Sequence, residues 1–277
     1  MILYVYLLSI IFSFIEASVP NFIRHPYTRG TGPVDTIDTT SIQVYFALNA
    51  WDIRDEKTYC DYFCLEIGKK TNKFYSYRWV EAEERRNKWM KEHHVPSGSG
   101  VRIVPEGNYN GWSEYQYSEW FISGSRLTEY SCFPMYLGKY NCFHEEDYPR
   151  QKWTILSDTL SICGFICQQA TCHFSGRDFT AWFCPKIPMK YGPWKFGGLP
   201  GLILKVYDKD KFYSFDCVKI ERKKKLLQKM DYKSYHRMER GKLLKIQRQI
   251  HEDISVVFGK PDENPKKIIT YQPLELE

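Results

Sequence analysis

Apolar and polar residues alternate in short runs along the second half of this chain, which is the spacing of half-buried β-strands. Compact turn sequences, Ser175-Gly176-Arg177-Asp178 and Asp208-Lys209-Asp210, separate neighbouring runs. Because short turns join antiparallel neighbours, we expect this half to fold as an antiparallel meander. The runs cover residues 153–155, 163–174, 179–183, 202–207 and 212–220.

The first half repeats the β pattern less regularly and then changes to a helical one. Strands are expected over residues 42–48, 59–68 and 73–79. Residues 80–94 are good helix formers with opposite charges four positions apart, which predicts a helix. Residues 101–150 hold short aromatic runs broken by glycine and proline, so only short strands are expected there.

Beyond residue 220, apolar side chains recur at near-helical spacing with lysine and arginine between them. The pattern predicts a basic C-terminal helix, although Gly241 interrupts it at a cost of about 1 kcal/mol. The last segment, residues 264–277, has no regular period. The apolar positions of the predicted helix are Leu227, Met230, Tyr235, Met238, Leu243, Ile246 and Ile250.

Together these elements predict a mainly β protein with a minor α component. The expected architecture is a strongly curved antiparallel sheet, or half-open barrel, with a C-terminal helix; a two-sheet sandwich is the alternative. Residues 19–277 are expected to form a single β-rich domain, since about 200–250 residues is ordinary for one all-β unit. The aromatic content of 17% agrees, because aromatic side chains favour strands.

The chain opens with an apolar run, residues 1–18, that ends in small residues. The run is shorter than the roughly 20 residues that a membrane-spanning helix needs. We interpret it as a cleaved secretory signal peptide, with a short N-terminal anchor as the alternative. No second long apolar segment follows, so we expect no transmembrane span in the mature chain and a location in the periplasm or cell envelope.

Nine cysteines in an exported chain predict disulfides, and the odd number leaves one thiol over. Cys132 and Cys142 bracket a loop that a bridge would close. Cys167 and Cys184 are the other candidates. If residues 176–177 form the turn between their strands, these two become diagonal neighbours and the bridge is strained. The connectivity stays open.

The sequence offers little for catalysis or for metal and cofactor binding. Cys163, Cys167 and Cys172 resemble a zinc set on paper, but strand residues four apart lie about 13 Å apart, too far for one ion. The acidic run at residues 144–147 is interpreted as solvated. The motifs of serine hydrolases, zinc proteases and phosphate-binding loops do not occur. We therefore predict no catalytic residues, no metal and no cofactor.

The formal net charge of +6 is mild, and a basic run at residues 219–225 carries part of the excess. We interpret this run as a solvated junction between strand and helix, with contact to an anionic partner as the alternative. Nucleic acid is not an expected partner of an exported protein.

Residues 191–204 join two predicted strands through glycine, proline and aromatic residues, a composition that fixes a backbone shape. We call residues 191–201 the signature loop. The sequence Gly-Leu-Pro-Gly-Leu-Ile at residues 198–203 resembles the signature of the GLPGLI family, exported proteins of Bacteroidota without an established activity. The match is specific over residues 153–207. Its other segments, in order, are Trp153-Thr154-Ile155, 166–170, 176–183, 187–188 and 192–196. Residues 271–276 also resemble the C-terminal tail of the family.

The resemblance implies an envelope protein and supplies no catalytic residues. Members of the family are often encoded beside outer-membrane receptors, so such a receptor is a candidate partner. We therefore expect non-enzymatic binding of a peptide, a lipid-like ligand or an outer-membrane partner. An envelope hydrolase or thiol-redox enzyme is the alternative, and a purely structural envelope component is the second alternative.

Two roles are open for the signature loop. Its apolar side chains fill one end of the curved sheet, or they rim a concavity that binds an apolar or extended ligand. A titratable cluster in a cleft beside Trp182 and Trp194 would favour an enzyme, and an apolar cleft would favour a binding protein. The candidate binding residues are Trp182, Gly192, Pro193, Trp194, Phe196, Gly198, Leu199, Pro200 and Gly201.

Overall fold

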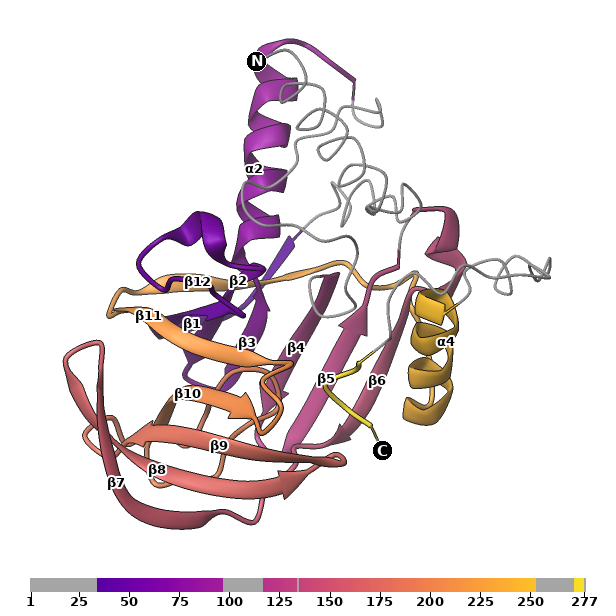
Figure 1. Ribbon diagram of the computed structural model, residues 1–277. Coiled ribbons are helices and arrows are strands. Elements are labelled where there is room, and N and C mark those ends of the chain that lie inside the picture. Colours follow the sequence, from indigo (N-terminus) through magenta and orange to yellow (C-terminus); the bar gives the residue numbers. More distant parts are fainter. Residues whose placement is uncertain (1–33, 97–116, 134, 253–271, 277) are drawn as a thin grey trace, which may run out of the picture.

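The computed structural model describes residues 34–96, 117–133, 135–252 and 272–276 (Figure 1). The predicted signal peptide and part of the expected C-terminal region lie outside these residues. Within them, one 13-stranded sheet dominates, in the order β13-β6-β5-β4-β3-β2-β1-β11-β10-β9-β8-β7, with β12 paired to β1. The two ends of this order do not pair, so the sheet curves without closing (Figure 1).

Neighbouring strands are antiparallel except for the short β13, which runs parallel to β6. Two α-helices and two short 3-10 helices, η1 (Glu56–Thr58) and η2 (Met135–Tyr140), complete the described part. The strands are β1 (Val34–Leu48), β2 (Asp61–Gly68), β3 (Thr71–Ser76), β4 (Ser118–Ser123), β5 (Arg126–Ser131), β6 (Cys142–Asp147), β7 (Thr154–Ile162), β8 (Phe165–Phe174), β9 (Arg177–Cys184), β10 (Leu202–Asp208), β11 (Ser214–Glu221), β12 (Lys225–Met230) and β13 (His236–Arg237). The α-helices are α2 (Tyr77–Glu92) and α4 (Arg240–Glu252).

The predicted fold class is confirmed: the protein is mainly β, with one strongly curved antiparallel sheet and a C-terminal helix. The described residues form a single sheet rather than the two sheets of a sandwich. The meander from β7 to β11 also follows the prediction, because each of these strands pairs with its neighbour in sequence.

The predicted long C-terminal helix is wrong over residues 227–239 and right from Arg240 onward. Residues 225–230 form β12, which pairs with the first part of β1, and only Leu227 of this strand is fully buried. Pairing with a partner nearly two hundred residues away overrides the local helical spacing. Gly241 lies at the first turn of α4, where it interrupts no helix interior.

The boundary near residue 77 also differs from the prediction, which extended a strand to residue 79. Ser76 caps α2 instead: its side chain accepts a hydrogen bond from the backbone N–H of Trp79. A serine at this position satisfies one of the free N–H groups of the first turn. Trp79 and Ala82 then face the protein and are buried.

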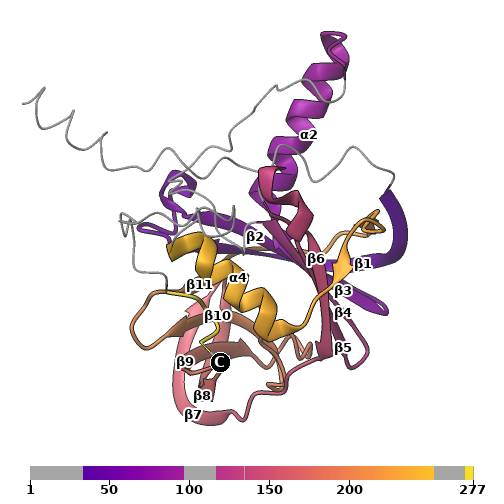
Figure 2. The same cartoon turned by 90° about the vertical axis from the view of Figure 1, so that its right-hand side faces the viewer.

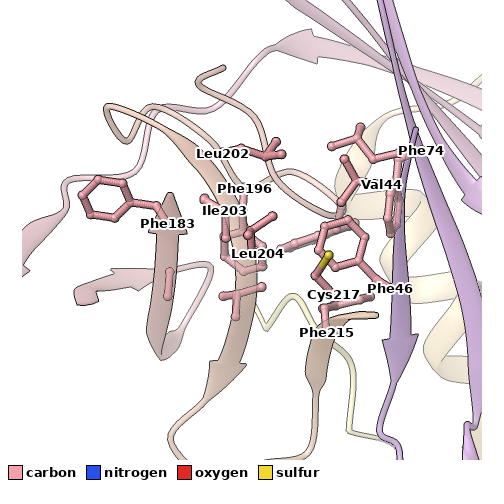
Figure 3. Packing of buried hydrophobic residues seen from close by; sticks show 14 of the residues in the cluster. Val44, Phe46, Phe74, Phe183, Phe196, Leu202, Ile203, Leu204, Phe215 and Cys217 are labelled. Carbon is pink, nitrogen blue, oxygen red and sulfur yellow. The ribbon is translucent and has the colours of Figure 1, made fainter. Parts of the chain in front are cut away.

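The main hydrophobic core lies on the concave side of the sheet, between β1–β5 and β8–β11. Figure 3 shows Phe196 of the signature loop packed among side chains from these strands, including Phe46 and Phe215. The loop therefore lies inside the curve of the sheet.

Both helices lie outside this core. Leu243, Ile246 and Ile250 of α4 pack with Cys132 and Cys142 in a second cluster. Figure 2 shows α4 near β6, with the end of the chain just below it. In the described ranges, neither helix has the length and apolar character that a membrane-crossing helix requires.

Candidate functional site

Side chains from the segment before β7 hold the backbone of the signature loop in place. The hydroxyl of Tyr148 donates to the carbonyl of Phe196 at 2.8 Å, and the indole N–H of Trp153 donates to the carbonyl of Gly197 at 2.8 Å. The Gln151 side chain accepts from the Gly197 N–H at 3.0 Å. These bonds add to the isolated β-bridge between Tyr191 and Gly197 and satisfy three polar backbone groups of the loop inside the protein.

Glycine is required in the signature loop for close approach. A Cβ at Gly197 would lie 2.2 Å from the hydroxyl oxygen of Tyr148, and one at Gly201 would lie 2.2 Å from the carbonyl oxygen of Cys184. Gly198 has a φ of +86°, which other residues rarely adopt. Glycine thus allows the loop backbone to pack closely against a tyrosine side chain at residue 197 and against backbone at residue 201.

The apolar members of the predicted binding set face the core. Trp194, Phe196 and Leu199 are each at most 1% exposed, whereas Gly198 and Pro200 are exposed. The positions favour the filling role for these side chains, and ligand binding by the loop stays a prediction. The buried backbone members of the set are Gly192, Pro193 and Gly201.

Trp182 and Trp194 differ in burial. Trp182 is half-buried and lies on the face of β9 opposite to Phe179 and Phe183, which point into the core where Trp194 is buried. Trp182 nevertheless packs against the edge of the core cluster that contains Trp194, and a cleft beside the two tryptophans stays a prediction.

All nine cysteines are free thiols in the structure, so the expected bridges are not present. Cys132 and Cys142 are both buried in the cluster beneath α4. The turn between β8 and β9 is formed by residues 175–176, not 176–177 as assumed, with φ of 49° and 76°. The ladder then ends at Gln168–Phe183, so Cys167 and Cys184 are the next opposed positions rather than diagonal neighbours.

A separate feature lies at the mouth of the curved sheet, where the tail segment Gln272–Leu276 is held by side chains from distant positions. Arg177 donates to the carbonyl of Pro273 through Nε at 3.0 Å and Nη2 at 2.7 Å. Tyr213 donates to the carbonyl of Gln272 at 2.6 Å. We call the residues that contact the tail segment the tail site: Ser175, Arg177, Lys195, Tyr213 and Arg240.

The tail segment adds one more backbone bond and an apolar anchor. The N–H of Leu276 donates to the carbonyl of Ser175 at 3.0 Å. Leu274 is fully buried and belongs to the main core. Burying such a side chain is worth about 1.5–3 kcal/mol, so the anchor contributes substantially to tail docking.

The carboxylate of the tail segment lies between two cations, Lys195 and Arg240, whose side chains are 2% and 15% exposed. Lys195 Nζ contacts Glu275 Oε2 at 3.1 Å, and Arg240 donates to Glu275 Oε1 at 3.0 Å. Each cation also has a carboxylate on the sheet: Lys195 contacts Glu146 at 2.6 Å and Arg240 contacts Glu129 at 2.6 Å. Each cation is thus shared between the tail and one strand.

The electrostatics of this network lower the pKa of two of its carboxylates, Glu146 and Glu275. Burial alone would raise the pKa of Glu146, but the hydrogen bond to His144 and the charge of Lys195 outweigh it and lower the pKa to about 2. Burial likewise opposes ionisation of Glu275, and Arg240 and Lys195 lower its pKa. The tail is therefore held by ion pairs that persist at neutral pH.

Contacts other than those with the tail segment also hold the Arg177 side chain in place. Its Nη1 pairs with Asp208 Oδ2 at 3.2 Å, and both side chains are buried. The ring centroids of Phe212 and Tyr213 lie 5.4 and 5.7 Å from its guanidinium carbon. A guanidinium held in this way presents two N–H groups in a defined direction, which suits recognition of a backbone carbonyl.

A hollow of about 530 Å³ lies over β7–β10. His173 and Asp178 pair at 2.7 Å there, with both side chains exposed. Burial raises the pKa of the nearby Cys172 thiol to about 12, which keeps it protonated. Its lining is Lys152, Thr154, Thr171, Cys172, His173, Asp178, Phe179, Thr180, Tyr207 and Lys209.

No three His, Cys, Asp or Glu side chains converge as metal ligands within the parts of the chain that the structure describes. The residues of the tail site were not among the predicted site residues. Two of them carried a signal, because Arg177 and Lys195 are charged residues inside the aromatic, glycine-rich stretch that resembles a family motif. The tail residue Glu275 also carried one, because residues 271–276 resemble the C-terminal tail of the family, whereas Arg240 carried none.

One comparison with known proteins matches part of the same stretch. A family model described as "Protein of unknown function (Porph_ging)" matches residues 175–205. Two similar solved structures are "Structure of PNGF-II in C2 space group", at 9% identity, and "Structure of PNGF-II in P21 space group", at 10% identity. Both have a TM-score of 0.46 and cover 76% of this chain.

The chain spans about a third of the length of those structures, 33% and 34% respectively. None of the curated proteins matches the chain.

Proposed function

We propose that this chain is an exported, non-enzymatic binding protein of the cell envelope, of the GLPGLI type, whose tail site binds an extended peptide. One observation carries the proposal: the mouth of the curved sheet holds the separate segment Gln272–Leu276 by the contacts that a bound peptide makes. The predicted signal peptide and the resemblance of the signature loop support the envelope location. The family model over residues 175–205 agrees with that resemblance at the level of a family without known function.

The contacts combine backbone recognition with side-chain selectivity. Arg177 and Tyr213 bind main-chain carbonyls, so they hold any peptide in the same extended path. The buried position of Leu274 selects an apolar residue, and the Lys195–Arg240 pair selects a carboxylate one residue later. Main-chain bonds supply affinity and alternate pockets supply specificity in such sites.

The tail site can also lose the tail segment without leaving Lys195 or Arg240 unpaired. When Glu275 leaves, Lys195 keeps Glu146 and Arg240 keeps Glu129. An uncompensated buried charge would cost about 3–5 kcal/mol, and these pairs avoid that cost. The tail segment can therefore be exchanged for a peptide of a partner, and the expected ligand has the order proline, apolar residue, acidic residue.

The test uses the full chain with a protease site inserted within residues 253–271, cleaved after folding. A labelled peptide, Gln-Pro-Leu-Glu-Leu, should bind the cleaved protein saturably in fluorescence anisotropy. The uncleaved protein is the control, and it should bind more weakly because its own tail competes at high effective concentration. The matched peptide Gln-Pro-Leu-Gln-Leu should bind about 10-fold more weakly or worse, since it lacks the charge-assisted bonds.

Equal binding of the two peptides, or no binding by the cleaved chain, would overturn the proposal. Loss of the fold when the cleaved tail is washed away would favour the second candidate, a purely structural component in which the tail completes the core. The burial of Leu274 is the observation that favours that candidate.

A further inference from the structure

The tip of the β7–β8 hairpin brings one cysteine back onto the sheet. Cys163 and Gly164 form the turn, with φ of 49° and 79°. In strand order β7 and β8 lie beyond β9 and β10, yet the Sγ of Cys163 is 3.7 Å from the Sγ of Cys217 on β11. Figure 1 shows the far end of this hairpin reaching toward β11. Curvature of the sheet thus joins two thiols 54 residues apart in sequence.

The two thiols differ in access. Cys163 is exposed, whereas Cys217 is 4% exposed and packs with the main core. The hydrogen bond between the two thiols lowers the pKa of Cys163 to about 7 and raises the pKa of Cys217. An accessible thiol beside a buried one is the arrangement of an attacking and a resolving cysteine.

Two further thiols, Cys167 and Cys184, lie near this pair and could form other disulfides in its place. Cys167 and Cys184 are fully buried at opposed positions of β8 and β9. Burial and the neighbouring Cys184 raise the pKa of Cys167 to about 12, so it is a poor first nucleophile at neutral pH.

We propose that Cys163 and Cys217 are a redox-active dithiol that exchanges with small disulfides and closes to an intramolecular bond between the hairpin tip and β11. The thiolate of Cys163 attacks one sulfur of a small disulfide, forms a mixed disulfide and releases one small thiol. The thiolate of Cys217 then attacks the Cys163 sulfur and displaces the second small thiol. The protein loses two thiol protons and two electrons, and the small disulfide is reduced to two thiols.

The test uses the reduced full-length chain and oxidised glutathione, with acid quenching, thiol counting and peptide mapping by mass spectrometry. The wild-type protein should lose two of its nine thiols and yield one cross-linked peptide pair containing Cys163 and Cys217. C217S should stop at one glutathione on Cys163. C163A should release glutathione more slowly than the wild-type protein does. Because Cys163 is exposed, this variant should keep the fold.

The control variant C172S removes a buried thiol outside the pair and should exchange as the wild type does. A wild-type protein that accumulates glutathione on Cys163 while Cys217 stays reduced would overturn the proposal. So would a first bridge between Cys167 and Cys184 or between Cys167 and Cys217. An unreactive wild-type protein with all nine thiols retained under these conditions would overturn it too.

Discussion

Lys195 links the signature loop to the site proposed for this chain. It lies between Trp194 and Phe196 of the signature loop, yet its ammonium group reaches Glu146 and Glu275 and is 2% exposed. A lysine is rarely buried this deeply unless it is paired. The same loop therefore fills the core with its aromatic residues and supplies a cation to the tail site.

At this scale the glycines of the loop allow a sharp test. Gly197→Ala places a methyl group 2.2 Å from the Tyr148 hydroxyl, so we expect a loss of about 1–3 kcal/mol in the free energy of unfolding. Urea denaturation measures it. The double variant G197A/Y148F should recover part of this loss, because it removes the clashing oxygen.

Gly241→Ala is the matched control. A Cβ there meets no atom within 4 Å, and in the first turn of α4 alanine should stabilise the protein by up to about 1 kcal/mol. If both alanine variants change stability alike, the close packing of the signature loop is not what requires glycine at residue 197.

The ion pairs of the tail site predict the response to acid. The folded pKa of Glu146 is about 2, against an ordinary value of 4.5. A lowered folded pKa stabilises the protein above the unfolded pKa, so this contribution is lost as pH falls from about 4.5 to about 2. The upper limit is about 3 kcal/mol.

E146Q should therefore flatten the fall of unfolding free energy over this range, measured by denaturation at successive pH values. D147N is the control, because Asp147 is 87% exposed and its pair with Arg126 is a surface one. Parallel curves for E146Q and the wild type would show that Glu146 does not hold the network together.

At the scale of elements, the tail segment is a short extended element whose docking depends on one side chain. Leu274→Ala should lower the docking free energy by about 2 kcal/mol or more. Hydrogen exchange of the Leu276 amide, which bonds Ser175, should then accelerate about 30-fold. Leu276→Ala is the control because that side chain is 43% exposed, and it should leave the rate of this amide nearly unchanged.

Local chemistry predicted some elements and missed others for identifiable reasons. The β8–β9 hairpin was foreseen because Ser175 and Gly176 supply the turn that joins its strands. Residues 227–239 were misassigned because β12 is specified by pairing with β1, a contact that no local spacing encodes. The start of α2 was displaced because Ser76 caps the helix with its side chain.

The candidate site was less predictable than the fold. Arg240 meets Glu129 across 111 residues, and Lys195 meets Glu275 across 80. Such pairs depend on how the sheet curves, which alternation of apolar residues does not determine. The signature loop could be located from composition, but its orientation into the core required the structure.

At the scale of the whole molecule, segments that are not strands of the open sheet cover its exposed parts. The signature loop fills its concave side, α4 covers one end, and the tail segment spans the mouth. The tail contacts Arg177 and Ser175 at the β8–β9 end, while Arg240 and Lys195 connect it to β5 and β6. Figure 2 shows the end of the chain between these parts.

Because of this placement, the tail segment is the part that a pulling force on its end loads first. Tension applied there would break the bonds of Gln272–Leu276 one after another, while the strand ladders behind them stay intact. Single-molecule pulling between residue 34 and the C-terminal end should therefore show a first, low-force extension that precedes rupture of the sheet and reverses on relaxation. A single high-force event would mean that the tail segment undocks only when the sheet itself unfolds.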